Sequence, residues 1–527
     1  MKRTLSMMLA LGLVAAPAPA RVHLGGPSVS DMADAITELD LDRARTMSEE
    51  IDDGGSALAL ERARLSLYLG DCDAAQATLA TLGGVKDAAP LAELAKNCAR
   101  ATAGSTVIED ASRGLWIRIQ DDEDRALVPM LSEVAVSARA AIERDLGVVM
   151  PRPLRIDLVR DLFSLSGVSG LPLNAAETTG TVAVARWGRV NMISPRAAPG
   201  GFPWEDTLAH EITHLALSRG TRDHAPLWLQ EGIAKRQEIR WRAPRPFDGD
   251  PSPDSIARDA LLSGESVGID KLGPSIAMLP SADAASIAFA EVSSFIDYWL
   301  RENGRPALML LFADLKGLGG SRAPDAMKSV SGYDLEGWIA RWQAYLRALP
   351  AEPAALAKEG GRDGERSTAL QALLTQAMPV DARNRARKVR TGELLFDRGA
   401  VALSAERFRG VLAADPNDPV IRWRLGRSLI AGRMDDRAAP LFESSEGLES
   451  ANSGWFALQG RFRRDRGLPD DKESFDFALA LDPYLEDAAC EGVFGIPDAA
   501  GQRSEPATAV AGSKRALCES ARKIHGD

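Results

Sequence analysis

Long hydrophobic runs are rare in this chain of 527 residues, and their scarcity limits what the protein can be. After the first twenty residues, the longest apolar run is ALMLLFA at 307–313. A helix needs about 20 apolar residues to cross a bilayer, so we expect no membrane span in the mature protein. Positively charged residues are also outnumbered, with 63 Lys and Arg against 74 Asp and Glu. The net charge of −11 disfavours a nucleic-acid partner, since phosphate binding needs concentrated positive charge.

The first twenty residues, MKRTLSMMLALGLVAAPAPA, are the exception to this scarcity of apolar runs. Lys2 and Arg3 precede a short apolar stretch at 5–14, and Ala-Pro-Ala at 18–20 supplies the small residues of a cleavage site. The pattern predicts a signal peptide over 1–20 that is cleaved after Ala20. It therefore predicts an exported protein, located in the periplasm or in the extracellular medium.

Cysteine is scarce as well, with only four in the chain and no C-x-x-C spacing that would suggest a zinc site made of thiolates. In an oxidising compartment, four cysteines allow three pairings. The local pairing, Cys72 with Cys98 and Cys490 with Cys518, would join neighbouring helices. A loop of that length stabilises the fold by about 3 kcal/mol in the chain-entropy account. We expect this pairing, with four buried thiols as the alternative.

The chain is longer than one hydrophobic core usually organises, so several domains are expected. Residues 21–105 are rich in Ala and Leu at helical spacing, with a helix hairpin at 57–82, and predict a repeat-like helical region. Residues 106–350 predict an α+β domain, because short strand-like segments begin there. Residues 351–380 have the Gly, Pro and charge of a linker, and residues 381–527 predict a second helical region.

The α+β assignment depends on four short segments with strand character. Two of them flank Trp187-Gly188 and are expected to form a hairpin. The predicted strands are 115–119, 154–159, 181–185 and 189–193, and the predicted helices are 126–145, 204–218, 227–240 and several between 285 and 349.

A period of about 34 residues runs through the C-terminal region. Glycines and phenylalanines recur at intervals of 34 residues, or 33 for the last phenylalanine: Gly392, Gly426, Gly460, Phe408, Phe442 and Phe475. Between about 385 and 485 the chain resembles tetratricopeptide repeats. The resemblance implies stacked helix pairs that offer a concave surface to a protein partner or clamp the neighbouring domain.

Histidine is also scarce, with five in the whole chain, yet two stand four residues apart in TLAHEITHLALS at 207–218. On an α-helix, His210 and His214 would lie on one face with Cβ atoms about 6 Å apart. Two imidazoles at that spacing can take adjacent corners of a tetrahedral Zn²⁺ site. Without a metal, these imidazoles and the Glu211 carboxylate would carry a desolvation cost in a largely buried helix. The spacing therefore predicts a zinc site.

Such a site needs a third ligand, and the chain offers two candidates. Glu231 lies seventeen residues past His214, in the amphipathic stretch LWLQEGIAKRQ at 227–237, and a turn between two helices would return it to the imidazoles. His224 lies ten residues past His214. Imidazole is a good zinc ligand, but a loop residue is held less firmly than a helical one. We favour Glu231 and expect His224 at the rim of the site.

At these residues the sequence resembles the gluzincin metallopeptidases, specifically the peptidase MA-like family. That family carries a Trp-Leu-x-Glu-Gly stretch after its H-E-x-x-H, as residues 228–232 do here. The resemblance covers about 110–350 and implies an α+β zincin-like fold, a Zn²⁺ cofactor and hydrolysis of a peptide or protein substrate. It implies His210, His214 and Glu231 as ligands, water in the fourth position, and Glu211 as general base.

Two positions depart from the family's pattern. Lys235 stands four residues after the glutamate ligand, where relatives place a carboxylate that orients a zinc histidine; Asp206 or Glu238 would have to replace that carboxylate. Phe289 stands where the family often has a tyrosine that stabilises the oxyanion. The candidates for oxyanion or substrate contacts are Tyr298, Tyr333 and His224.

The leading hypothesis is an exported zinc peptidase flanked by helical repeats, with an extended peptide pairing on the edge of the predicted hairpin. The alternative is a repeat-based protein-interaction scaffold whose peptidase-like domain is weakly active or inactive, with zinc in a closed site of four protein ligands. A third hypothesis treats residues 21–105 as a lid or pro-segment over the site.

Overall fold

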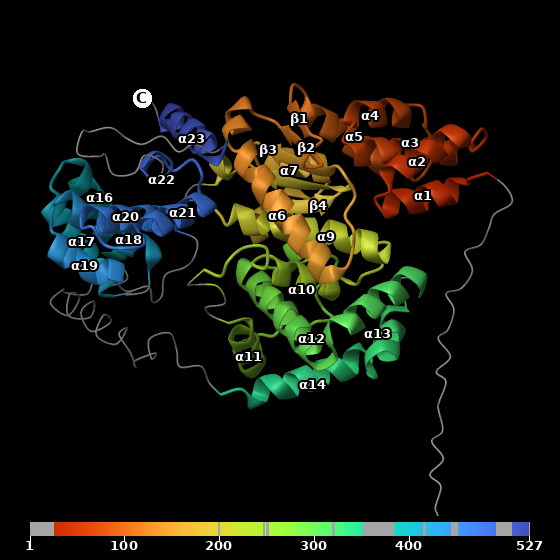
Figure 1. Ribbon diagram of the computed structural model, residues 1–527. Helices are drawn as coiled ribbons and strands as arrows, with labels where there is room; N and C mark the ends of the chain where they lie inside the picture. Colours follow the sequence, from red (N-terminus) through yellow and green to blue (C-terminus); the bar gives the residue numbers. More distant parts are fainter. Residues whose placement is uncertain are drawn as a thin grey trace, which may run out of the picture.

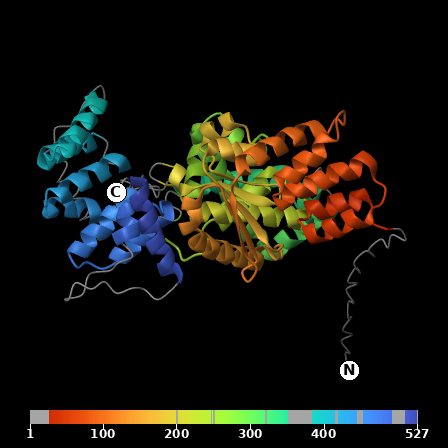
Figure 2. The ribbon, with the colours of Figure 1, turned by 90° about the horizontal axis from the view of Figure 1, so that it is seen from above.

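The computed structural model describes residues 26–198, 201–245, 248, 252–318, 322–350, 384–414, 418–443, 452–491 and 509–525. The expected signal peptide and the expected linker at 351–380 lie outside the described residues. The described chain forms an N-terminal helical unit, a middle unit with a five-stranded sheet, and a C-terminal helical unit. The two helical units lie on opposite sides of the middle unit (Figures 1 and 2).

The N-terminal unit is helical throughout, in agreement with its Ala- and Leu-rich sequence. Its helices are α1 (Val29–Thr37), α2 (Leu41–Glu50), α3 (Gly55–Leu69), α4 (Cys72–Ala80) and α5 (Ala88–Thr102). Gly70 ends α3 in the left-handed conformation, with φ of 86°, which lets the chain reverse into α4. Cys72 of α4 is joined to Cys98 of α5, the local pairing expected from the sequence. The disulfide ties the second helix hairpin together.

The middle unit contains a mixed sheet with the strand order β1-β2-β3-β5-β4. Its strands are β1 (Thr106–Asp110), β2 (Leu115–Ile119), β3 (Leu154–Val159), β4 (Ala183–Arg186) and β5 (Arg189–Ile193). β2, β3 and β5 run parallel, whereas β1 and β4 are antiparallel to their neighbours. Trp187 and Gly188, both at positive φ, form the tight turn of the β4–β5 hairpin. Strand β4 therefore lies at one edge of the sheet.

The sheet has one apolar and one polar face, because alternate residues of a strand point to opposite sides. Ile117, Ile156 and Val190 are buried on the apolar side, where α6 (Val128–Leu146) and α9 (Trp204–Thr221) pack against each other. The remaining helices of the unit are α7 (Leu162–Ser169), α8 (Leu173–Thr179), α10 (Leu227–Gln237), α11 (Pro253–Ser263), α12 (Ala282–Leu318), α13 (Ala323–Ser331) and α14 (Leu335–Ala348), with 3-10 turns η1 (Asp122–Ala126), η2 (Pro195–Ala197) and η3 (Ile276–Met278). α12 is interrupted at Gly304.

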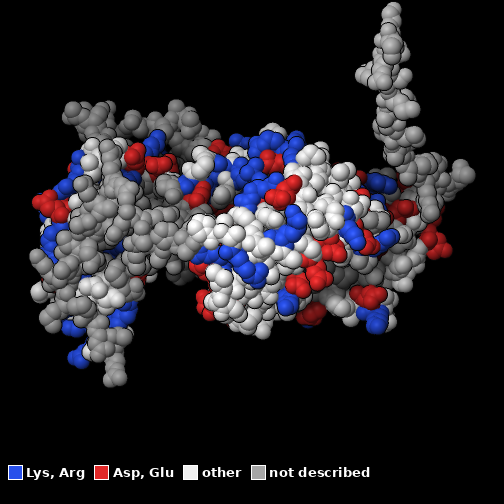
Figure 3. All heavy atoms as spheres, turned by 90° about the horizontal axis from the view of Figure 1, so that it is seen from below, with Lys and Arg blue, Asp and Glu red and all other residues white. Residues whose placement is uncertain are grey.

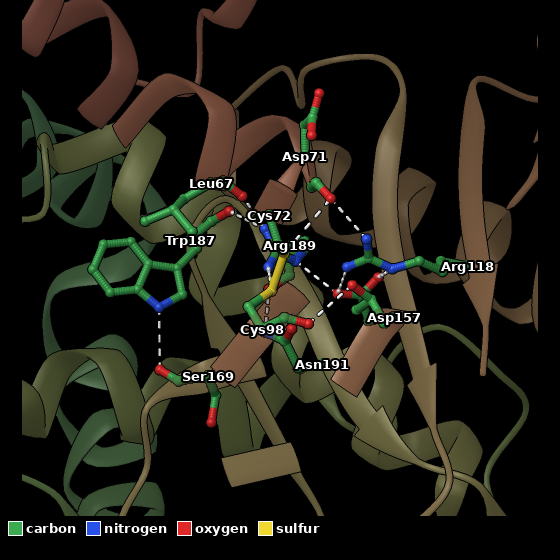
Figure 4. Close-up of a disulfide and its surroundings, with 12 residues drawn as sticks. Leu67, Asp71, Cys72, Cys98, Arg118, Asp157, Ser169, Trp187, Arg189 and Asn191 are labelled. Carbon is green, nitrogen blue, oxygen red and sulfur yellow. Dashed lines mark hydrogen bonds and ion pairs between the residues drawn. A yellow bond between two sulfur atoms is a disulfide. The ribbon is translucent and has the colours of Figure 1, made fainter. Parts of the chain in front are cut away.

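The polar face carries a buried charge cluster that meets the N-terminal unit. Asp157 of β3 accepts hydrogen bonds from Arg118 of β2 at 2.7 and 2.9 Å and from Arg189 of β5 at 2.7 Å. The same guanidinium groups also donate to backbone carbonyls near the end of α3, Arg118 to Gly70. Arg189 donates to the carbonyl of Leu67 (Figure 4). The two arginines thus bind the sheet to the N-terminal helices.

The C-terminal unit is a series of packed helix pairs. Its helices are α16 (Arg385–Asp397), α17 (Val401–Leu412), α18 (Pro419–Ala431), α19 (Asp435–Glu443), α20 (Ser453–Asp465), α21 (Asp471–Leu481), α22 (Glu486–Glu491) and α23 (Ala509–His525). In three pairs a glycine leaves room for a phenylalanine ring, because a Cβ would lie 2.7, 2.9 and 3.0 Å from it: Gly392 with Phe408, Gly426 with Phe442, and Gly460 with Phe475. This repeated contact is a physical reason for the 34-residue period. A disulfide between Cys490 and Cys518 joins α22 to α23.

Helix α9 is held near both of its ends by the flanking units. At its start, the indole N–H of the buried Trp204 donates to the carbonyl of Leu479 at 3.2 Å. The backbone N–H of Phe202 donates to the carbonyl of Leu481 at 3.0 Å. Near its end, Arg219 donates to the backbone carbonyl of Glu38 at 2.8 Å. The helix that carries both histidines of the H-E-x-x-H is therefore braced from two directions.

Within the described ranges, no helix combines the length and the apolar content that a membrane crossing requires. On the face of the middle unit seen in Figure 3, basic and acidic side chains lie side by side.

Candidate metal centre and its cleft

Two helices bring the histidines and the favoured glutamate together. His210 and His214 lie one turn apart on α9, and Glu231 lies on α10. Between the helices, Arg222 and Asp223 adopt left-handed backbone conformations, which reverse the chain within a few residues. As a result, Glu231 faces the two imidazoles from the opposite side.

The three potential ligand atoms lie close to the spacing that a tetrahedral zinc ion requires. The Nε2 atoms of His210 and His214 are 3.1 Å apart, and Oε2 of Glu231 lies 3.4 and 3.6 Å from them. Zinc bonds of about 2.0–2.2 Å at tetrahedral angles place ligand atoms roughly 3.3–3.6 Å apart. Among the described residues, His210, His214 and Glu231 form the group able to hold a metal ion. The donor set and its spacing fit Zn²⁺.

Each imidazole is oriented by a hydrogen bond at its other nitrogen. Nδ1 of His210 lies 2.8 Å from Oε1 of Glu238, and Nδ1 of His214 lies 3.3 Å from Oε1 of Gln230. The second oxygen of Glu238 accepts from Lys235 at 2.6 Å. Asp206, the other carboxylate weighed from the sequence, is bound instead by Arg242 at 2.7 Å. Glu238 therefore occupies the orienting role that Lys235 leaves open.

The electrostatics of the cluster favour a cation. Burial alone would lower the pKa of His210, but hydrogen bonds to Glu231 and Glu238 raise it to about 10. Burial would raise the pKa of Glu231, yet the imidazoles of His214 and His210 hold it below its ordinary value. The pKa of Glu238 is likewise lowered, by Lys235 and His210, against the effect of burial. These carboxylates stabilise positive charge at the point where a metal ion would sit.

Glu211 lies beside the ligands and also touches the sheet edge. Burial raises the pKa of its carboxyl group. Its Oε2 accepts a hydrogen bond from the backbone N–H of Ala185 in β4, at 2.5 Å. In an antiparallel pair, alternate residues direct their backbone groups toward the partner, and Val182 does so by accepting from Ile193 of β5. The backbone groups of Ala183 and Ala185 consequently face away from β5, toward the cleft.

A cleft of about 700 Å³ contains this cluster. It is lined by the candidate metal-binding group, by Glu211, by the length of β4 and by the segment around η3. The N-terminal unit also contributes, through Thr37, Leu39 and Tyr68. Residues 21–105, which the lid hypothesis places over the site, thus contribute three residues to one wall of the cleft.

The other residues considered from the sequence lie outside the metal-binding group, and most lie outside the cleft. Nδ1 of His224 contacts the backbone carbonyl of Leu315 at 3.0 Å, outside the metal-binding group. Tyr298 is buried and stacks on Tyr345, while Tyr333 is 47 % exposed beside Trp338. None of these three candidates lines the described cleft, whereas Phe289 does, with its ring edge-on to His210 at 6.1 Å. Neither Tyr298 nor Tyr333 therefore takes the place of Phe289 at the cleft.

Several residues that shape the site carry only weak signals in the sequence. Gln230 precedes the expected ligand directly, but its role depends on the angle between α9 and α10. Tyr68 and Ala185 carry no sequence signature of a site, because only the tertiary fold brings them to the cleft.

Comparison with known families agrees with this geometry. Residues 135–348 match the family model of the peptidase MA superfamily, which spans α9, α10 and the helices up to α14. The match supports a gluzincin-like peptidase domain and implies hydrolysis of a peptide or protein substrate. Members of this superfamily usually depend on zinc, and here the His and Glu cluster supplies a suitable donor set. A search among curated proteins finds no match.

Proposed function

We propose that the protein is an exported zinc peptidase in which His210, His214 and Glu231 hold Zn²⁺ and Glu211 is the general base. The observation that carries the proposal is the spacing of three ligand atoms, 3.1, 3.4 and 3.6 Å, on two helices. The family match over these helices supports the same reaction class.

When bound, the ion would lower the pKa of a water ligand and polarise the carbonyl of the substrate. Glu211 would accept a proton from the attacking water and deliver it to the amine that leaves when the C–N bond breaks. An extended substrate would pair with the outward backbone groups of Ala183 and Ala185. Glu211 must then exchange its hydrogen bond with Ala185 for one with water.

The flanking regions enter the proposal in three ways. Two disulfides, together with the sequence of residues 1–20, support export into an oxidising compartment. The Gly–Phe contacts support tetratricopeptide-like repeats in residues 381–527, which would bind a protein partner or brace the peptidase domain. We propose 21–105 and 106–350 as the other two folded regions, joined to the repeats by a linker at 351–380.

The test is Glu211→Gln in the full mature chain. Hydrolysis of an unstructured protein should fall by a factor of about 10² to 10⁴, whereas bound zinc should stay near one ion per chain. Glu133→Gln, an exposed change on α6, is the matched control and should leave both unchanged. Full turnover by Glu211→Gln would eliminate the assigned base. The scaffold alternative predicts weak or no hydrolysis even by the zinc-loaded wild type.

A further inference from the structure

One end of the cleft is built by residues that hold no metal. Leu39 and Tyr68 come from the N-terminal unit, and Arg186 and Trp187 come from the end of β4 and the hairpin turn. A substrate paired along β4 would meet these residues at the end of the strand. This end of the cleft is called the hairpin wall below.

The hairpin wall is fixed by packing and hydrogen bonds. The ring N–H of Trp187 donates to the carbonyl of Ser169 at 3.1 Å (Figure 4). Tyr68 packs edge-on against the Trp187 ring, with the centroids 6.1 Å apart. A Cβ on Gly188 would lie 2.6 Å from the Tyr68 ring, so the turn and α3 approach as closely as glycine permits. Arg189 holds the carbonyl of Leu67, the neighbour of Tyr68, in place.

Arg186 gives the hairpin wall its charge. It is the one Lys or Arg among the described residues that line the cleft. Its guanidinium carbon lies 5.3 Å from the centroid of the Trp187 ring. No described carboxylate lies within ion-pair distance of Arg186. The carboxylates along the cleft are Glu211, Glu231 and Glu238 of the metal centre and Asp223, which accepts from the hydroxyl of Ser218 at 2.5 Å.

We propose that Arg186 determines specificity by binding a carboxylate of the substrate at the hairpin wall. The inference rests on the proposed peptidase function and names the substrate class of the same cleft. An arginine fork matches a carboxylate with two parallel hydrogen bonds. The stacked position on Trp187 keeps the fork ordered before the substrate arrives, which reduces the entropy lost on binding.

The direction of pairing decides which carboxylate is bound. A peptide antiparallel to β4 would point its N-terminal part toward Trp187, and Arg186 would then bind an Asp or Glu side chain on the N-terminal side of the cut. A peptide parallel to β4 would present its C-terminal part, which includes a terminal carboxylate. Antiparallel pairs are the commoner arrangement in sheets, so we expect the side chain.

The first experiment maps cleavage sites in a random decapeptide library by mass spectrometry, with free and with amidated C termini. Wild type should enrich Asp and Glu about tenfold at one position N-terminal to the cut, with either terminus. The enrichment should disappear in Arg186→Gln and persist in Arg100→Gln, an exposed control with the same charge change outside the cleft. A preference restricted to free C termini would assign the terminal carboxylate instead. Equal profiles for wild type and Arg186→Gln would overturn the proposal while leaving the peptidase function intact.

The second experiment separates binding from hydrolysis. In zinc-loaded Glu211→Gln, fluorescein-labelled decapeptides of alternating Ala and Glu should bind about tenfold more tightly than those of alternating Ala and Gln. Adding Arg186→Gln should remove the difference, whereas adding Arg100→Gln should not. The protein's net charge of −11 works against nonspecific attraction of the acidic peptide. Equal binding of both peptides would refute the role of Arg186 even if no hydrolysis is found.

Discussion

Replacing Glu238 by Gln measures how much the carboxylate that orients His210 contributes to zinc affinity. Glu238 contacts His210 at 2.8 Å and Lys235 at 2.6 Å, and it holds no metal itself in the proposed site. Glutamine keeps the size of the side chain and removes its charge. The substitution should therefore weaken zinc binding without removing a ligand.

The expected loss of zinc affinity is 10- to 100-fold, or about 1.4 to 2.7 kcal/mol, the usual effect of removing a carboxylate behind a metal-binding histidine. A second effect falls on stability, because Lys235 loses its ion-pair partner. The Lys235 side chain keeps 39 % of its surface exposed, so its ammonium can turn toward water. We expect this cost to stay near 1 kcal/mol.

The assay is competition for zinc with a chromophoric chelator, combined with urea unfolding of the metal-free protein. The double variant Glu238→Gln/Lys235→Met should recover the part of the stability that the unpaired ammonium costs, but not the zinc affinity, because His210 still lacks its carboxylate. Glu133→Gln serves as the control. A zinc dissociation constant within twofold of wild type for Glu238→Gln would refute the orienting role.

Three further predictions concern the contacts that hold the units together. Asp157→Asn leaves two buried arginines without their carboxylate and should lower the free energy of unfolding by about 3–5 kcal/mol, measured by urea unfolding. The control Asp122→Asn, at the exposed pair with Arg125, should lower it by less than about 1 kcal/mol. Equal effects of the two substitutions would contradict the burial argument. Trp204→Ala should destabilise the protein by about 3–5 kcal/mol and expose the C-terminal unit to limited proteolysis, and unchanged proteolysis would show that Trp204 does not anchor that unit. Burial would raise the pKa of Glu38, but Lys316 and Arg222 hold it below its ordinary value of 4.5. The stability from Glu38 is thus complete above that value and lost as pH falls through the lower folded pKa. Wild type and Glu38→Gln should therefore differ in Tm at pH 7, and the difference should shrink as the pH falls below 4.5; a constant difference would exclude this linkage.

Local patterns predicted the elements that carry the chemistry. The strands of the hairpin and helices α6, α9 and α10 lie within a few residues of their expected bounds, because apolar spacing and the turn at Trp187-Gly188 determine them locally. Strand β1 was missed, since its alternation of partly exposed residues is weak and its pairing with β2 supplies most of its order. Helices α7, α8 and α11 were missed too, because all three are short.

The residues of the candidate site also differ in how much the sequence alone could predict about them. His210 and His214 are one turn apart on any helix, so their sequence spacing alone was enough to predict a shared metal. The position of Glu231 required a turn between α9 and α10; the sequence indicated two helices in succession, and the resemblance to a family supported the same residue, but the angle between the helices is set by tertiary contacts. The choice of Glu238 over Asp206 depends on which side chain Arg242 captures, and that is decided only by tertiary contacts.

The brace at the start of α9 has a consequence for the timing of synthesis. Trp204 and its hydrogen-bond partner Leu479 are 275 residues apart in the sequence. At about 5–20 residues per second, roughly 15–55 s separate their appearance on the ribosome. For most of this interval the nascent chain contains every side chain of the candidate metal centre but not the segment that steadies its main helix. The steadied form of this helix would then arise late in biogenesis, after the C-terminal unit has folded.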